Sequence, residues 1–530
     1  MLGRRNEHQW ANSVAARRFS LTPSAFLLCI AGTLLGLLVL SYAEEVLAVL
    51  SVVVLLVLLH VFNRTNYLVV MGSVAIGLAT FSVGLASIEG DTSFLVVALL
   101  FALIAATLLL KRNEKDMDLF SPFVLTCAGF LLAFGWVGLE FMRDSDIPRH
   151  LLAHALWYVN LGYILFLVGY ENTLGKILGL KVGLPGDNWS AGRMTGAILG
   201  CATIGVLLFL LLVRLAGYAS PLEILQENIN EFRPAVGGGL AYFVYCIMFF
   251  LQIACVLLLL RVLRMPGARI SHLLGLLTFV SCVCAVFWVF ASRFMFVSLL
   301  GGLAICVHHL KRRMKLVEIV GLGFLLVLFV TAYGLYRGVG YRWQTIEQAQ
   351  EELAKLKIRE SVSERLDALA RLTTVLQHEP RYDPQTVILS VLLRPVPRSF
   401  APDKPYASGA EITRVFWPEL ATGGVTIEPT LFGELYYDFG IFGIIFGLIA
   451  YGILIRVLQT YFEGKTRRAG FLLHYSLIFP VPVRILLGGF DGGGLTDLIF
   501  FTLGSWAVLW YLSKGTTRKL ANSAALSPPS

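Results

Sequence analysis

Long apolar runs separated by short polar links fill most of this chain, and they constrain its fold more than any other feature. A helix of about 20 apolar residues can cross the ~30 Å hydrocarbon core of a bilayer. An open sheet would leave backbone groups without hydrogen bonds in lipid, so these runs predict helices. Hydrophobic residues make up 57% of the chain and charged residues only 15%, which excludes a soluble globular protein.

The spacing of the runs predicts an all-α polytopic membrane protein with about fourteen transmembrane helices. We expect these spans near 23–41, 45–62, 66–88, 93–110, 121–142, 150–170, 192–213, 238–260, 270–291, 293–309, 315–336, 430–456, 469–485 and 496–513. The predicted organisation is an N-terminal segment (1–22), spans 1 to 11 (23–336), a large loop (337–429), spans 12 to 14 (430–513) and a disordered tail (514–530).

The net charge of +9 is distributed unevenly along the chain. Basic residues recur in alternate links, as in the pairs Arg17-Arg18, Lys111-Arg112 and Arg312-Arg313. Cytoplasmic loops of membrane proteins carry such an excess of Lys and Arg. The pattern predicts cytoplasmic termini and a periplasmic large loop, and it explains the basic charge without nucleic-acid binding.

No motif indicates a cofactor. The chain has no Walker loop, and its histidines lack the HExxH spacing of metalloenzymes, so we expect neither a nucleotide nor a metal site. All eight cysteines fall within predicted spans, so the exported loop contains no disulfide framework. Because the sequence has no ATP-binding motif, any group transfer must use a donor that is already activated.

The large loop of roughly ninety residues divides into two parts by composition. Apolar residues at helical spacing predict a helical hairpin over 343–378. The part over 379–429 is rich in proline and is expected to be irregular. The hairpin either covers the outer ends of the spans or forms a lid over a substrate cleft.

Three groups of polar residues on the predicted outer face could carry chemistry. The first is the proline-stiffened run that contains Arg394, Arg398 and Lys404. The planar guanidinium of arginine gives paired, charge-assisted hydrogen bonds to phosphate. The run therefore indicates a phosphate-binding segment, or alternatively a contact with lipid headgroups.

The second group begins predicted span 12. Glu434 and Asp438 are four residues apart and share one face of a helix, where a carboxylate in the membrane is costly and indicates function. Such a carboxylate accepts a proton, orients an arginine or forms a structural ion pair. Tyr437 is either a substrate contact or a residue of the membrane-interface belt. Nearby glycines on another side predict close packing of a neighbouring helix: Gly433, Gly440, Gly443 and Gly447.

The third group follows predicted span 13. Pro480 and Pro482 are expected to end the helix, and the glycine-rich stretch 488–494 can turn its amides toward an anion. Arg484 and Asp491 are the charged residues here, and a plain flexible hairpin is the alternative. Further arginines at span boundaries, Arg293, Arg337 and Arg342, also face outward. Arginines from at least four segments thus point to a multiply charged anionic ligand.

Three runs in this part of the chain resemble the Wzy-type oligosaccharide repeat-unit polymerases of bacteria. They are Arg394-Pro-Val-Pro-Arg398 with Pro402-Asp-Lys-Pro405, the run from Pro429 to Gly443, and the helix start Ser292-Arg293. The resemblance covers about residues 290–460. The related O-antigen ligases carry a loop histidine followed by Asn, Ser or Gln. Here His378 precedes Glu379, which favours a polymerase.

The resemblance implies an inner-membrane glycosyltransferase of GT-C-like architecture that polymerises repeat units linked to undecaprenyl pyrophosphate, as in lipopolysaccharide biosynthesis. It places Arg293, Arg394, Arg398 and Arg484 on the pyrophosphate, with Glu434 as base or orienting carboxylate. The expected substrate contacts include Arg337, Arg342, Lys404, Tyr437, Asp438 and Asp491. Neither a metal nor a cofactor is expected, and a chain-length-regulating co-polymerase and a flippase are the expected partners. An O-antigen-type ligase, or a lipid-linked oligosaccharide flippase or exporter, is the alternative.

Overall fold

The computed structural model describes most of the chain after residue 66. The described residues are 67–111, 117–144, 146–183, 189–221, 223, 241–264, 270–290, 293–315, 318, 319, 321–323, 367–383, 389, 393, 401, 403–406, 408–422, 427–463, 465, 468–490 and 494–525. The chain forms two compact units, residues 1–113 and residues 114–530. Each unit is described by itself.

The described part of the first unit is a hairpin of two apolar helices, α4 (Tyr67–Glu89) and α5 (Ser93–Lys111). The turn between them uses Gly90, whose φ of 66° favours glycine, and the Asp91 carboxylate accepts a hydrogen bond from the Ser93 amide at 2.8 Å. A Cβ on Gly72 would lie 3.0 Å from Leu109 Cγ, so the two helices approach closely.

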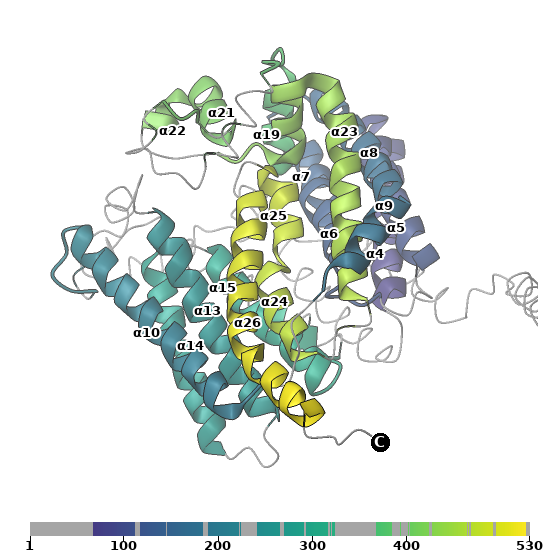
Figure 1. Cartoon of the computed structure of the whole chain (residues 1–530). Helices are drawn as coiled ribbons and strands as arrows, with labels where there is room; N and C mark the ends of the chain where they lie inside the picture. The colour runs from purple at the N-terminus through teal and green to yellow at the C-terminus, as the bar shows by residue number, and fades with distance from the viewer. Residues whose placement is uncertain are drawn as a thin grey trace, which may run out of the picture. The chain divides into compact units, whose positions relative to one another are not determined.

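The second unit contains the remaining helices (Figure 1). In chain order they are α6 (Pro122–Phe130), η1 (Leu131–Trp136), α7 (Val137–Asp144), α8 (Arg149–Tyr170), α9 (Thr173–Lys181), α10 (Ala191–Leu215), α13 (Ala241–Arg264), α14 (Ile270–Val289), α15 (Arg293–Leu310), α19 (Ala368–Leu376), α21 (Ser408–Phe416), α22 (Pro418–Thr422), α23 (Thr430–Phe462), α24 (Ala469–Ile478), α25 (Val481–Gly488) and α26 (Leu495–Ala525). The described residues contain no strand.

One group of helices forms around α23, which packs against α6, α8 and α9. The backbones of α8 and α23 touch: a Cβ on Gly452 would overlap the Phe166 carbonyl, and one on Gly169 would overlap the Ile449 carbonyl. Small residues permit such close approach between membrane helices. Buried aromatic rings fill the space beside this contact, including a T-shaped pair of Phe130 and Phe432 with centroids 6.1 Å apart.

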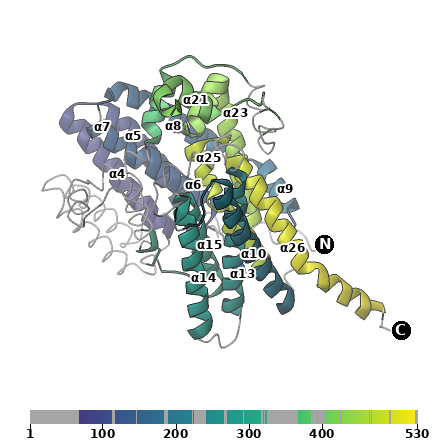
Figure 2. The same cartoon turned by 90° about the vertical axis from the view of Figure 1, so that its left-hand side faces the viewer.

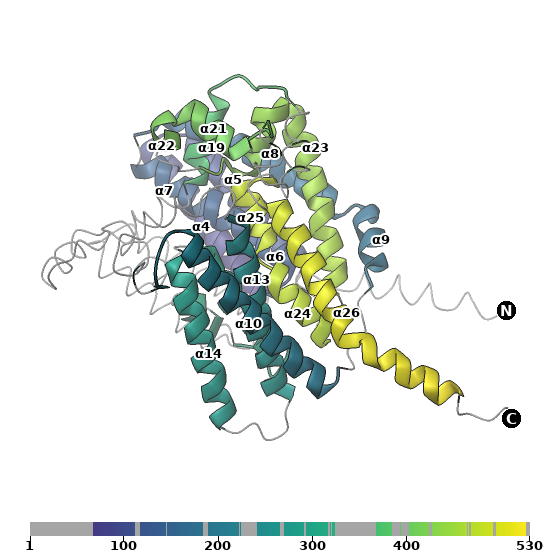
Figure 3. The ribbon, with the colours of Figure 1, turned by 60° about the vertical axis from the view of Figure 1, so that its left-hand side comes forward.

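A second group consists of α10, α13, α14 and α15, which lie side by side in Figures 1 and 2. Gln252 on α13 donates a hydrogen bond to Ser298 on α15 at 2.6 Å, and both side chains are buried. The helices α24, α25 and α26 run between the two groups (Figure 3). α25 packs against α23 and α6, while α24 and α26 pack against α13. Residues of α25 are therefore placed to meet side chains from either group.

The helix α23 is two helical segments joined by a sharp bend. Gly440 has φ 65° and ψ −153°, a backbone conformation essentially restricted to glycine. The chain folds back after this bend, so a Cβ on Gly443 would overlap the Leu435 carbonyl and one on Gly447 would lie 2.5 Å from the Leu435 side chain. The predicted packing against a neighbouring helix is therefore wrong for Gly443 and Gly447, which pack against the first segment of their own helix. Gly433 does lie beside Val375 of the neighbouring α19, and Gly440 lies beside Tyr382.

The prolines of predicted span 13 interrupt that span within its length. Pro480 separates α24 from α25, and the chain then resumes a helix in which the Arg484 amide donates to the Pro480 carbonyl at 3.0 Å. The segment 469–488, which comprises α24 and α25, is long and apolar enough to cross a membrane. Arg484 consequently lies on a helix that continues the span, and the helix does not end at the prolines as predicted.

Ten helices in the described residues are long and apolar enough to cross a membrane, which makes this a multi-pass membrane protein. They coincide with ten of the predicted spans, and the shorter apolar helix Phe294–Leu310 coincides with an eleventh. The predicted spans 23–41 and 45–62, and most of 315–336, lie outside the described residues.

Part of the predicted irregular segment 379–429 is helical, as α21 and α22. The helix α19 covers the last part of the predicted hairpin 343–378, and residues 343–366 of that hairpin lie outside the described residues.

Candidate functional site

Arg484, predicted as a catalytic residue, is held by side chains from three other helices. Its Nη1 lies 2.5 Å from Oδ2 of Asp497 in the first turn of α26, and its Nη2 donates to the Tyr245 hydroxyl of α13 at 3.5 Å. The guanidinium carbon lies 4.3 Å from the centroid of the Phe294 ring of α15. Both charges are mostly buried, since the Arg484 side chain is 17% exposed and that of Asp497 is 1% exposed. Ionisable residues within membrane spans pair in this way.

The turn that follows α25 lies against two carboxylates. Gly489 has φ 85°, and a Cβ on it would overlap the Glu434 carboxylate. A Cβ on Gly488 would lie 2.6 Å from Oε2 of Glu428, which also interacts electrostatically with Arg484. Glu434 is 2% exposed. The structure thus brings Glu434 to the same turn as Arg484, although fifty residues separate them in sequence.

Asp438 and Tyr437 contact other elements. The Ser408 hydroxyl, at the start of α21, donates to Asp438 Oδ2 at 2.8 Å. The Tyr437 carbonyl accepts a hydrogen bond from the Arg381 amide at 2.6 Å, and the Tyr437 side chain is buried in a small apolar cluster. Glu434 and Asp438, predicted to share a helix face, therefore contact different partners, the α25 turn and α21.

The remaining predicted site residues divide between described and undescribed segments. Arg293 is the first residue of α15 and directly precedes Phe294, so this helix begins beside Arg484. Lys404 lies in the segment before α21, where its amide donates to the Ala401 carbonyl at 3.1 Å. The other candidates lie outside the described residues: Arg337, Arg342, Arg394, Arg398 and Asp491.

The described surroundings of Arg484 are acidic. Asp497, Glu428 and Glu434 lie close to Arg484 or to the turn beside it. Arg371 of α19 donates from Nη1 to the Glu428 carbonyl at 2.9 Å, but its guanidinium is also paired with Asp367. Among the described residues of this site, carboxylates therefore outnumber arginines.

Sequence reasoning missed Asp497, Glu428, Tyr245 and Phe294 as partners of the site. Asp497 gave a usable signal, because it is an acidic residue at the start of the apolar run 496–513, and such a residue calls for a partner. Tyr245 and Phe294 gave none, since aromatic residues are common in spans.

Comparison with known proteins gives one local similarity. A segment of 85 residues, 16% of this chain, is 35% identical to the O-antigen polymerase of Salmonella typhimurium strain LT2 and equally to that of Salmonella typhi. The match spans only a fifth of the length of these relatives, 20% in each case. No protein-family model matches the chain, and no solved structure gives a significant match. The chain is therefore similar in part to O-antigen polymerases.

Proposed function

We propose that this protein is a Wzy-type polymerase that joins lipid-linked oligosaccharide repeat units at the periplasmic face of a bacterial inner membrane. The observation that carries this proposal is the 35% identity to O-antigen polymerases over 85 residues. The buried Arg484 and Glu434, on two helices at one turn, support a reaction site. The termini would lie in the cytoplasm and the segment 337–429 in the periplasm.

In the proposed reaction, a hydroxyl oxygen of a single lipid-linked repeat unit attacks the anomeric carbon of a glycan chain carried on undecaprenyl pyrophosphate. The new glycosidic bond forms as the bond from that carbon to the pyrophosphate oxygen breaks. Glu434 accepts the hydroxyl proton, and undecaprenyl pyrophosphate leaves with the bonding electrons. A buried carboxylate is suited to this transfer because burial disfavours its charged form and so increases its affinity for a proton.

The leaving pyrophosphate needs positive charge, and Arg484 is already paired with Asp497. We therefore assign Arg484 the task of orienting the leaving group through its remaining N–H donors. Arg398, Arg394 and Arg293 would supply most of the compensating charge, which is worth most where water is excluded. The remaining contacts to the two glycans would come from Arg337, Arg342, Lys404, Tyr437, Asp438 and Asp491.

The test is polymerisation by the purified full-length protein, given one synthetic lipid-pyrophosphate repeat unit and read as a ladder of products on a gel. We expect a ladder from the native protein and a rate lower by about 10²–10³-fold in Glu434→Gln and Arg484→Ala. Arg264→Gln, at the exposed end of α13, is the matched control and leaves the rate unchanged.

Two results would overturn the proposal. One is glycan transfer to a lipid A acceptor without any ladder, which indicates a ligase. The other is movement of the same lipid across vesicle membranes without a ladder, which indicates a flippase.

A further inference from the structure

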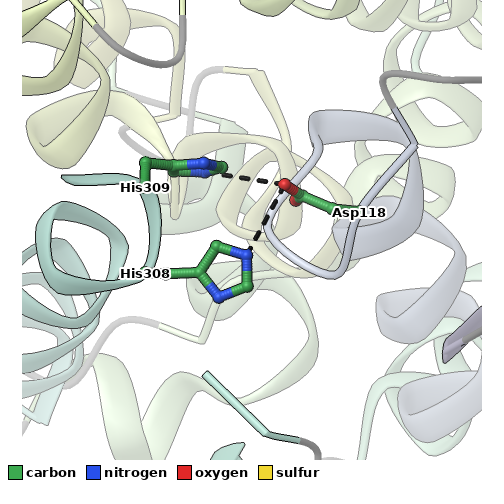
Figure 4. Close-up of side chains that lie close together, drawn as sticks. All are labelled: Asp118, His308 and His309. Atoms are coloured by element: carbon green, nitrogen blue, oxygen red, sulfur yellow. Dashed lines mark ion pairs between the residues drawn. The ribbon is translucent and has the colours of Figure 1, made fainter. Parts of the chain in front are cut away.

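Three possible metal ligands from distant parts of the sequence meet at one end of α15 (Figure 4). Nε2 of His309 lies 3.6 Å and Nε2 of His308 lies 3.8 Å from Oδ2 of Asp118, which precedes α6. One ligand atom from each residue lies within 4.8 Å of the other two. We propose that Asp118, His308 and His309 bind a divalent transition-metal ion of the zinc class. The proposal is independent of the polymerase reaction.

The two imidazole nitrogens are buried, and a backbone hydrogen bond orients the carboxylate. Nε2 of His308 and Nε2 of His309 are inaccessible to solvent and have no hydrogen-bond partner in the described structure. A buried polar atom without a partner calls for an ion or a water molecule. The other carboxylate oxygen of Asp118, Oδ1, accepts a hydrogen bond from the Phe120 amide at 2.9 Å, which directs Oδ2 at the two rings.

The geometry and the ligand types fit one metal class. Two imidazoles and one carboxylate suit zinc, cobalt or nickel, whereas magnesium and calcium prefer oxygen ligands alone. Tetrahedral zinc with bonds of about 2.1 Å separates its ligand atoms by about 3.4 Å. The observed Nε2–Oδ2 separations of 3.6 and 3.8 Å are too long for hydrogen bonds and lie close to that value. Because the three ligand atoms together lie within 4.8 Å of one another, the two rings must move closer together when a metal binds. The Asp118 side chain is 14% exposed, so a water acting as fourth ligand would approach from this side.

Two neighbouring groups weaken metal binding, and each gives a consequence that can be measured. The Met314 amide donates to Nδ1 of His308 at 3.2 Å, and a metal on Nε2 requires a proton on Nδ1. Binding therefore breaks the Met314 contact, because a protonated Nδ1 cannot accept that hydrogen bond. Arg313 is exposed, and its positive charge acts on both rings. This charge weakens the binding of a cation.

The site would join α15 to the segment before α6, at the end of α15 opposite Arg484. His308 is 14 residues beyond Phe294, or about 21 Å along the helix axis. The Phe462 ring at the end of α23 packs on His309 with centroids 5.5 Å apart. A metal here would therefore fix the packing of α15 against the segment before α6, beside the end of α23 and at a distance from the proposed reaction site.

The experiment is a titration of chelator-treated, Strep-tagged full-length protein in detergent with Co²⁺, followed by its visible absorption and by displacement with Zn²⁺. We expect one ion per chain, a Zn²⁺-dependent rise in the unfolding temperature and loss of Met314 amide protection from hydrogen exchange. His309→Gln, His308→Gln and Asp118→Asn should each weaken binding by about 100-fold or more, while Arg313→Gln strengthens it several-fold. His154→Gln, an exposed histidine on α8, is the matched control and leaves binding unchanged.

Absence of stoichiometric Co²⁺ binding to the native protein would mean that only a water molecule bridges these side chains, and it would overturn the proposal. Binding that persists in all three ligand variants would overturn it as well. The unfolding temperature of each variant without metal, compared with that of the metal-free native protein, shows whether a loss of binding reflects loss of fold.

Discussion

At the scale of single residues, the contact between Gly489 and Glu434 is the most restrictive feature of the candidate site. Gly489 has φ 85°, and its missing side chain leaves the space that the Glu434 carboxylate occupies. Any other residue at this position would be strained by its backbone conformation and would displace the carboxylate. Glycine at this position therefore both permits the turn and leaves space for the carboxylate of the proposed base.

Gly489→Ala should lower stability by about 1–3 kcal/mol through backbone strain. It should also lower the polymerisation rate, because Glu434 must move. The measurements are thermal unfolding in detergent and the ladder assay. Gly200→Ala is the matched control, since a Cβ on Gly200 meets no atom within 4 Å. Unchanged activity in Gly489→Ala would remove Glu434 from the proposed mechanism.

The ion pair of Arg484 and Asp497 gives a second prediction at this scale. Removing one partner leaves a buried charge unpaired, so Asp497→Asn should destabilise the protein by about 3–5 kcal/mol. The double variant Arg484→Gln with Asp497→Asn should be more stable than either single variant. A double-mutant cycle of unfolding temperatures checks this, and simple additivity of the two changes would show that the pair contributes little.

At the scale of elements, the bend in α23 determines where the candidate residues lie. The first segment, Thr430–Phe439, carries Glu434 and Asp438 to the α25 turn and to α21, and the second segment continues along α8. A straight helix over 430–462 would separate these contacts. The conformation of Gly440 is therefore a condition for assembling the site.

Gly440→Ala should lower stability by about 1–3 kcal/mol, because φ 65° with ψ −153° is unfavourable for alanine. A Cβ there would also lie 2.7 Å from the Tyr382 hydroxyl oxygen. Combining Gly440→Ala with Tyr382→Ala relieves the contact and leaves the backbone strain, so thermal unfolding should recover only in part. Full recovery in the double variant would assign the whole effect to the Tyr382 contact.

At the scale of the whole molecule, the charge pattern predicts which side of the membrane each end of α15 faces. Residues 310–315 carry four basic side chains, Lys311, Arg312, Arg313 and Lys315, which predicts that this end of α15 faces the cytoplasm. The segment before α21, with Asp403, should then be periplasmic. The proposed reaction site and the proposed metal site would face opposite sides of the membrane.

Labelling of introduced cysteines by a membrane-impermeant maleimide tests this orientation in intact spheroplasts. Asp403→Cys should be labelled at once, and Lys311→Cys only after the membrane is permeabilised; both positions are exposed. The native protein gives the background from its own cysteines. The opposite labelling pattern would place the loop in the cytoplasm and would contradict a periplasmic polymerase.

Much of the architecture could be predicted from sequence, because the length of an apolar run reports directly on whether a helix can span a bilayer. Ten of the predicted spans are long apolar helices in the described structure. The bend at Gly440 could not be predicted, since an isolated glycine in an apolar run also occurs in straight helices. The helices α21 and α22 were missed because prolines and charges in that segment obscure their short periodicity.

Hydrophobicity, charge and residue chemistry are local properties, so they were enough to predict the membrane-spanning helical class and a side for each link, and to single out Arg484 and Glu434 as candidates. The partners of these two residues emerged from the fold. Asp497 faces Arg484, Gly489 faces Glu434, and Asp118 meets His308 and His309 across roughly 190 residues of sequence. Such contacts depend on how helices pack and bend, and that packing is set by close glycine contacts and aromatic rings distributed over the described helices.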